Sequence, residues 1–174
     1  MTEFSRPHRL DQIGAGETQI DVHAEPEERA ALARRFDLRA IDSLNARITL
    51  HSDAIGVVAK GHLSARVVQS CIVTDEPVPA AIEEDFAIRF IPETSEGEGA
   101  DEFELSEDEC DTVFYSGSAI DLGEAAAETL ALALDPYPRS ANAAEALKAA
   151  GVISEEEAGP FGALAGLKDK LAGK

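Results

Sequence analysis

The chain has 174 residues, of which 44% are hydrophobic, and a formal net charge of −19. This length suits one domain with a substantial core. There is no run of about 18 apolar residues that could span a membrane, and the polar start from Met1 to Leu10 is unlike a secretory signal. We therefore expect a cytoplasmic protein. Its two cysteines cannot close a tetrahedral zinc site alone, and a reducing cytosol disfavours a disulfide between them.

The negative charge is concentrated in one segment. Residues 76–128 hold 17 acidic residues and one basic residue, Arg89. A field of one sign repels polyanions and attracts basic partners, which argues against broad nucleic-acid binding through this surface. Ten of the acids lie in Glu93–Asp111, without Lys or Arg, and this composition predicts a mobile loop at 93–111.

The N-terminal half alternates between strand and helix patterns. Phe4–Leu10 fits an edge strand because Pro7 is tolerated only at an edge, and Glu17–Ala24 alternates as a strand does. Pro26 then opens a helix that has acidic residues at its start and Arg34 and Arg35 at its end. Further strands are predicted at Arg47–His51 and Ile55–Lys60.

The clearest alternation covers Gly61–Val73 and places Cys71 on the inward face. Cys71 could be a ligand or a nucleophile, but its inward phase favours a small buried hydrophobic residue. Cys110 is flanked by carboxylates that disfavour its thiolate and make it a poor nucleophile. His51 and His62 fall on solvent-facing phases of neighbouring strands, and without a third ligand we expect a surface pair and no metal site.

Two short strands, Phe86–Phe90 and Thr112–Tyr115, precede the strongest helix pattern, Asp121–Leu134. Its apolar stripe recurs every four residues, Asp121 is a suitable N-cap and Glu124 a capping-box partner. A weaker helix is predicted at Ala141–Ala150, and a flexible tail at 151–174. Residues 1–150 thus predict one α+β domain. It should have about six antiparallel strands in a curved sheet or small barrel, one main amphipathic helix packed on it, and a short helix in the N-terminal half.

Two groups of residues are candidates for binding. Arg29, Arg34, Arg35 and Arg39 surround the first helix and form either an RNA-facing patch or, as the pattern favours, a solvated helix end. Tyr137-Pro138-Arg139 is a rigid corner between prolines that serves as a docking point or only as a helix stop. The sequence has no phosphate-binding glycine loop, nucleophile elbow or calcium-loop spacing. We therefore expect no catalysis, metal or cofactor.

Three blocks of sequence resemble the YceD family of large ribosomal RNA subunit accumulation proteins. They are GHLSARVVQSCIVTDEPV (Gly61–Val78), IDLGEAAAETLALALDPYPR (Ile120–Arg139) and GPFGALAGLKDKL (Gly159–Leu171), in the order found in that family. Many members carry Cys-x-x-Cys in the first block. Here Cys71 is followed by Thr74 at the second position, so the pair is broken and any metal or redox role inferred from it is in doubt.

The resemblance implies a non-catalytic factor that supports 23S ribosomal RNA accumulation. We expect the acidic segment Glu76–Glu128 to dock a basic ribosomal protein or assembly factor, with specific contacts from Tyr137, Pro138 and Arg139 and from Asp121 and Glu124. RNA contact would be limited to Arg139 and the arginines near the first helix. The charge alone is equally compatible with an acidic adaptor for a basic partner unrelated to ribosomes. The direct partner and the oligomeric state do not follow from the sequence.

Overall fold

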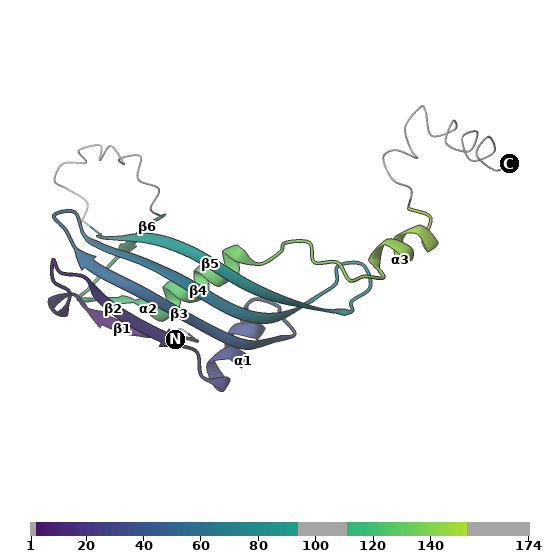
Figure 1. Ribbon diagram of the computed structural model, residues 1–174, viewed down its shortest axis with the longest axis horizontal. Coiled ribbons are helices and arrows are strands. Elements are labelled where there is room, and N and C mark those ends of the chain that lie inside the picture. The colour runs from purple at the N-terminus through teal and green to yellow at the C-terminus, as the bar shows by residue number, and fades with distance from the viewer. Residues whose placement is uncertain (1–2, 94–110, 153–174) are drawn as a thin grey trace, which may run out of the picture. The chain divides into compact units, whose positions relative to one another are not determined.

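The computed structural model describes residues 3–93 and 111–152 (Figure 1). The chain divides into two compact units, which we call the larger and the smaller unit. The larger unit comprises Met1–Gln69 and Pro79–Pro136, and the smaller unit comprises Ser70–Val78 and Tyr137–Lys174. The smaller unit therefore combines two segments that are distant in sequence, the loop around residues 70–78 and the segment that follows Pro136.

A five-stranded sheet in the order β2-β3-β4-β5-β6 forms most of the larger unit. Its strands are β2 (Thr18–His23), β3 (Ala40–Ser52), β4 (Val57–Ser70), β5 (Pro77–Pro92) and β6 (Asp111–Tyr115). The β2–β3 and β3–β4 pairs are antiparallel. Within the described residues β2 and β6 are both edge strands, so this sheet is open and the alternative of a small barrel is not what the structure has.

The prediction of an antiparallel arrangement is wrong for the last pair, because β6 runs parallel to β5, with Ile88 opposite Asp111. A parallel pair needs a crossover of about a dozen residues or more. The 18 residues between Pro92 and Asp111 are long enough to provide one. Residues 94–110 of this connection, which make up most of the predicted mobile loop at 93–111, lie outside the described part of the chain.

Two of the predicted strands are one. Ile55–Lys60 and Gly61–Val73 correspond to the single strand β4, which ends at Ser70. Gly61 does not interrupt it, because a Cβ there would lie only 2.7 Å from the carbonyl oxygen of Arg47 and 2.6 Å from the ring of Phe86. Glycine at this position permits the close approach of neighbouring strands. The prediction that placed Cys71 in this strand is wrong, since Cys71 is the first residue of the following loop.

A second, two-stranded sheet ties the N-terminal segment to the start of the main helix. It pairs β1 (Pro7–Arg9) with β7 (Ala119–Asp121) in antiparallel register, and a short 3-10 turn at Leu10–Gln12 follows β1. The predicted strand at Phe4–Leu10 is confirmed, although it is shorter, and Pro7 lies at its first position.

The hydrophobic core lies between the five-stranded sheet and the two helices of the larger unit. These helices are α1 (Pro26–Arg35) and α2 (Leu122–Ala133), and α2 runs behind the sheet in Figure 1. Leu122, Ala126 and Leu130 of α2 are fully buried in the same cluster as the inward residues of β3 and β4. This confirms the main amphipathic helix, and α3 (Ala143–Ala149) in the smaller unit matches the weaker predicted helix. None of the helices in the described ranges is long and apolar enough to span a bilayer.

Candidate partner-binding site

The loop between β4 and β5 is closed by its own backbone. Cys71 N–H donates to the carbonyl of Glu76 at 2.8 Å, and Asp75 N–H donates to the carbonyl of Cys71 at 2.9 Å. Asp75 adopts a left-handed conformation (φ 55°), which short polar residues tolerate. The chain therefore reverses within six residues, which allows only an antiparallel continuation from β4 into β5.

The sulfur of Cys71 accepts hydrogen bonds inside this loop. Cys71 is buried, with 3% of its surface exposed, so the prediction of a buried residue is confirmed. The backbone N–H groups of Val73 and Thr74 each lie 3.4 Å from Sγ. Burial raises the pKa of the thiol, but hydrogen bonds from Thr74, Ser140 and Val73 outweigh burial and lower this pKa to about 6. The sequence pattern, which suggested a small buried hydrophobic residue, gave no sign of these hydrogen bonds to Sγ.

Thr74 links the loop to the segment that follows the main helix. Its hydroxyl lies 3.0 Å from that of Ser140 and donates to Glu76 at 3.1 Å. Glu76 also accepts from the amide of Asn142 at 3.0 Å, and hydrogen bonds from Ser140, Asn142 and Thr74 lower the pKa of its carboxyl. Thr74, which stands where many family members have the second cysteine, thus has a hydroxyl that contacts Ser140 in the segment after the main helix.

These bonds fix the Tyr137-Pro138-Arg139 corner within the smaller unit. The backbone N–H of Ile72 donates to the carbonyl of Pro138 at 3.0 Å, and the ring of Pro138 is buried. Tyr137 is 69% exposed and Ile72 is 54% exposed, and Arg139 is also exposed. The smaller unit therefore presents two large apolar side chains and a guanidinium on a backbone held by hydrogen bonds, a combination that suits a docking surface.

Asp121 and Glu124 belong to the larger unit and make internal contacts. The carboxylate of Asp121 accepts from Gly123 N–H at 3.0 Å and Glu124 N–H at 3.2 Å, which confirms its N-cap role. It also accepts from the backbone N–H of Arg6 at 2.7 Å and from the hydroxyl of Ser5. Glu124 already has a partner, because its two carboxylate oxygens accept hydrogen bonds from the two terminal nitrogens of the Arg35 guanidinium, Nη2 at 2.6 Å and Nη1 at 3.0 Å. A partner-binding role for these two acids stays a prediction.

The four arginines around α1 have different surroundings. Arg35 is neutralised by Glu124 and by Glu3. Arg29 donates to the carbonyl of Ala24 at 2.7 Å. Arg29, Arg34 and Arg39 line a common cavity between α1 and the start of β3, and Arg35 does not. The sequence analysis grouped the four arginines because they are close along the chain. The helical period places Arg29 and Arg34 on the face of α1 that lines the cavity and turns Arg35 toward Glu124.

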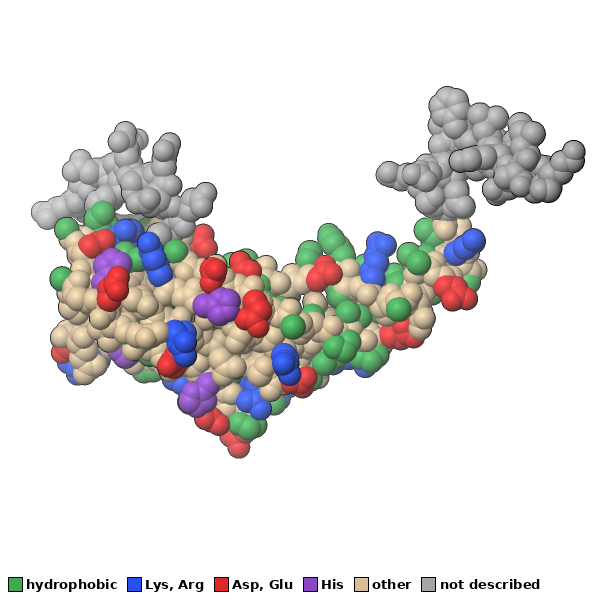
Figure 2. All heavy atoms as spheres, viewed as in Figure 1, with side chains coloured by type: hydrophobic (Ala, Val, Ile, Leu, Met, Phe, Trp, Pro, Cys, Tyr) green, Lys and Arg blue, Asp and Glu red, His purple; other side chains and the backbone are tan. Residues whose placement is uncertain are grey.

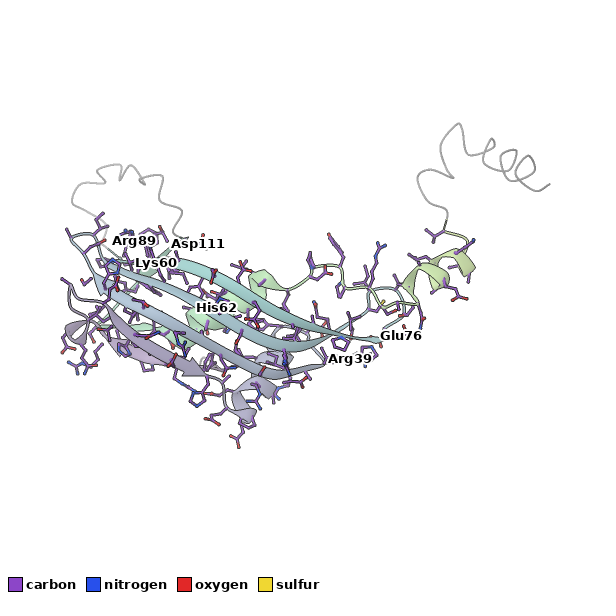
Figure 3. All side chains as sticks on the ribbon, in the orientation of Figure 1. Arg39, Lys60, His62, Glu76, Arg89 and Asp111 are labelled. Carbon is purple, nitrogen blue, oxygen red and sulfur yellow. The ribbon has the colours of Figure 1, made fainter. Side chains whose placement is uncertain are left out.

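The histidines do not form the expected surface pair. The register places His51 opposite Val58 and His62 opposite Arg47. Both ring nitrogens of His62 contact carboxylates, Nδ1 with Asp85 at 2.7 Å and Nε2 with Glu83 at 2.9 Å. These contacts raise the pKa of His62. Figure 3 labels His62 near the middle of the sheet face toward the viewer. Across residues 3–93 and 111–152, no three His, Cys, Asp or Glu side chains group as metal ligands would, and Cys110 lies outside these ranges.

The open face of the sheet is polar and of mixed charge. Arg47 on β3 pairs with Asp21 on β2 at 2.8 Å, and a shallow cavity of about 480 Å³ lies over these strands, lined by Asp21, His23, Asn45, Arg47, His62 and Ser64. Figure 2 shows acidic, basic and histidine side chains interspersed over the sheet and hydrophobic side chains gathered toward α3. The sheet face and the smaller unit thus offer surfaces of different chemistry.

The fold and the site together define a mixed α+β protein built on an open sheet, with an exposed apolar corner in a unit of its own. The chain belongs to the YceD family. The family model, described as large ribosomal RNA subunit accumulation protein YceD, matches residues 59–168. This match covers the Cys71 loop, α2 and the corner. No significant match was found among the curated proteins or among the solved structures.

Sequence reasoning missed several residues of the smaller unit. Ser140 and Asn142 looked like ordinary polar residues after a helix stop, and Ile72 was placed in a strand. The available signal was the clustering of small polar residues next to prolines, which often marks a loop with side-chain to backbone bonds. Their partners lie 66 residues away in the chain, and no local pattern reveals a pairing of that range.

Proposed function

We propose that this chain is a non-enzymatic, cytoplasmic factor that supports 23S ribosomal RNA accumulation and large-subunit biogenesis by binding a basic ribosomal protein or assembly factor. Family membership supports the process. The observation that carries the binding role is the exposed corner of the smaller unit, where Tyr137 is 69% exposed on a segment hydrogen-bonded to the Cys71 loop.

The geometry of the corner favours protein binding. Aromatic residues and arginine are the side chains most enriched among energetically dominant interface positions. Tyr137 and Arg139 supply both, and the hydrogen bond from Ile72 to Pro138 holds their backbone before a partner arrives. A surface that is already ordered loses less conformational entropy on binding than a flexible one.

The acidic surface supports a basic partner. Residues 76–128 carry 17 acidic residues against one basic residue. Within the described part of this segment, Glu83, Glu84 and Asp85 of β5 are exposed. Individual surface charges contribute little affinity, but complementary fields raise association rates at low salt. The acids would therefore steer the encounter, and the corner would hold the partner.

Depletion of the protein followed by complementation tests the proposal. Loss of 23S relative to 16S ribosomal RNA is expected on depletion, and wild-type protein should restore it. A Tyr137→Ala/Arg139→Gln variant should restore it poorly, whereas Phe114→Ala, which removes a comparably exposed aromatic side chain (64%) from β6, should restore it fully. Unchanged ribosomal RNA ratios, together with another phenotype, would instead favour an acidic adaptor unrelated to ribosomes.

Binding kinetics separate steering from holding. Crosslinking and capture of the partner from cells provides the ligand. Replacing the ten acids of Glu93–Asp111 by Ser and Gln should slow association and flatten its salt dependence, whereas the corner variant should mainly speed dissociation. If neutralising the ten acids changes neither the association rate nor its salt slope, the acidic segment has no part in docking.

A further inference from the structure

A cavity of about 380 Å³ lies between α1 and the first residues of β3, within the larger unit. Its lining includes three arginines, Arg29, Arg34 and Arg39, and apolar residues among which are Ala30, Leu38 and Ile41. No acidic residue belongs to this lining. The whole chain has a net charge of −19, yet the lining of this cavity contains three basic residues and no acidic residue. The composition of the chain does not predict such a site.

The position of the arginines follows from the helix and from the turn that ends it. Residues at positions 26, 29, 30, 33 and 34 share one face of α1, because the helix repeats every 3.6 residues. After the helix, Asp37 is left-handed (φ 54°) and Leu38 N–H donates to the carbonyl of Ala33 at 2.8 Å. This bond is the one that closes a Schellman turn. The turn directs Leu38–Ile41 back along the helix, where Leu38, Arg39, Ala40 and Ile41 line one side of this open cavity.

The ion-pair pattern distinguishes this cavity from the rest of the surface. Arg35, one residue beyond Arg34, faces away and is paired with Glu124 and Glu3. Arg47, over the sheet cavity, is paired with Asp21. Arg34 is exposed and makes no ion pair within the described part of the chain. A guanidinium that has no ion pair among the described residues, and that shares a cavity with Arg29, is available to an incoming anion.

We propose that this cavity binds a nucleotide of single-stranded RNA, with the backbone phosphate on Arg34 and Arg29 and the sugar or base against the apolar lining. Guanidinium groups match phosphate oxygens in geometry and remain charged at every physiological pH. The apolar lining beside the cations fits a nucleotide better than a bare anion, and single-stranded RNA presents both chemistries in each repeat.

This inference deepens the proposed function, on which it rests only for the choice of RNA as the source of the phosphate. The corner of the smaller unit contributes nothing to it. A binding assay with purified components therefore tests it separately, because that assay contains no ribosomal protein and no ribosome. Failure of the chain to bind RNA would not affect the proposal that the corner binds a protein. Failure to capture a protein partner would not affect the proposal that the cavity binds RNA.

The experiment measures fluorescence anisotropy of a labelled ten-nucleotide oligouridine titrated with the full chain at several salt concentrations. Arg34→Gln is expected to weaken binding by roughly tenfold, the size of one charged hydrogen-bonded contact, and to reduce the salt slope by about 0.7. The matched control is Arg47→Gln, which removes the same charge from the sheet face and should change affinity by less than about twofold. Arg34 is exposed, so its replacement should leave the fold intact, and circular dichroism checks this.

Four results would overturn the proposal. The first is no binding of oligouridine by wild-type protein at low salt. The second is equal weakening by Arg34→Gln and Arg47→Gln. Binding of inorganic phosphate or uridine monophosphate as tightly as the oligonucleotide would assign the cavity to a free phosphate ligand. Binding of poly-glutamate that oligouridine does not displace would assign it to an acidic peptide.

Discussion

The two blocks that carry the family resemblance within the described residues perform different tasks. Around Ile120–Glu124, almost every group is used internally: Leu122 is fully buried, Asp121 holds Ser5 and Arg6, and Glu124 pairs with Arg35. At the end of Gly61–Val78, hydrogen bonds hold a loop whose Ile72 side chain stays 54% exposed. The stretch Ile120–Glu124 anchors the chain, whereas the loop at the end of Gly61–Val78 presents a surface together with the Tyr137-Pro138-Arg139 corner. A sequence motif by itself does not tell these two uses apart.

The largest effect should come from breaking the anchor. Asp121→Ala removes the N-cap of α2 and leaves the N–H of Arg6 without its acceptor, which should lower the free energy of unfolding by about 2–4 kcal/mol. Gly123→Ala should also destabilise, by about 1–3 kcal/mol, because its Cβ would lie 2.6 Å from the carbonyl oxygen of Phe4.

Urea unfolding measures both variants. Gly16→Ala is the control, since a Cβ at Gly16 meets nothing within 4 Å, and a change of less than about 0.5 kcal/mol is expected. If Asp121→Ala were as stable as wild type, the hydrogen bonds from Ser5 and Arg6 to Asp121 would not contribute to the stability of the fold.

A smaller and more local effect is expected at the loop. Ser140→Ala removes the partner of Thr74 and a donor to the Cys71–Glu76 region, so local opening should become easier by about 1 kcal/mol. Hydrogen exchange of the Ile72 amide, which donates to Pro138, should then accelerate by about fivefold while global stability changes little. Ser118→Ala, which lies outside this network, is the control. An unchanged Ile72 rate would mean that the corner is held without Thr74 and Ser140.

The Cys71 thiolate should give the loop a pH dependence. A folded-state pKa of about 6, below the ordinary pKa of a cysteine thiol, means that the stabilising contribution of this thiol is fully present above the unfolded-state pKa and is lost as pH falls toward 6. The difference in unfolding free energy between wild type and Cys71→Ala should therefore grow from pH 6 to pH 9 under reducing conditions. A difference that is flat over this range would contradict the hydrogen-bonded thiolate.

The smallest effect is expected on the sheet face. Asp85 and then Glu83 raise the pKa of His62, so this contact stabilises the fold fully below the unfolded pKa and is lost as pH rises through the folded value. An NMR titration of the His62 ring should show its pKa falling in Glu83→Gln/Asp85→Asn. Glu84→Gln, with the neighbouring exposed acid changed instead, should leave it in place.

Much of the fold could be predicted from local patterns. The apolar stripe of α2, its Asp121 cap, the helix at Pro26 and the alternation along β4 are all local signals, and the structure confirms each of them. The predictions were wrong where the structure of a segment depends on residues distant in the sequence. The parallel β5–β6 pair depends on a long connection, and the single strand β4 depends on what Gly61 packs against.

The candidate site was less predictable than the fold. Exposure of Tyr137 and Arg139 followed from two nearby prolines, but their hydrogen-bonded support from the Cys71 loop did not. Likewise the helical period could group Arg29 with Arg34, yet only the turn at Asp37 shows that Arg39 joins the same cavity.

The sequence by itself determined the class of the fold, the identity of its main helix, the family and the concentration of negative charge in one segment. These depend on composition and on periodicities set by the backbone of each element. Tertiary structure alone decided which charges are neutralised and which stay available. Arg34 and Arg35 are adjacent and identical in type, but the helix turns them to different sides, one toward two carboxylates and one toward a cavity without any.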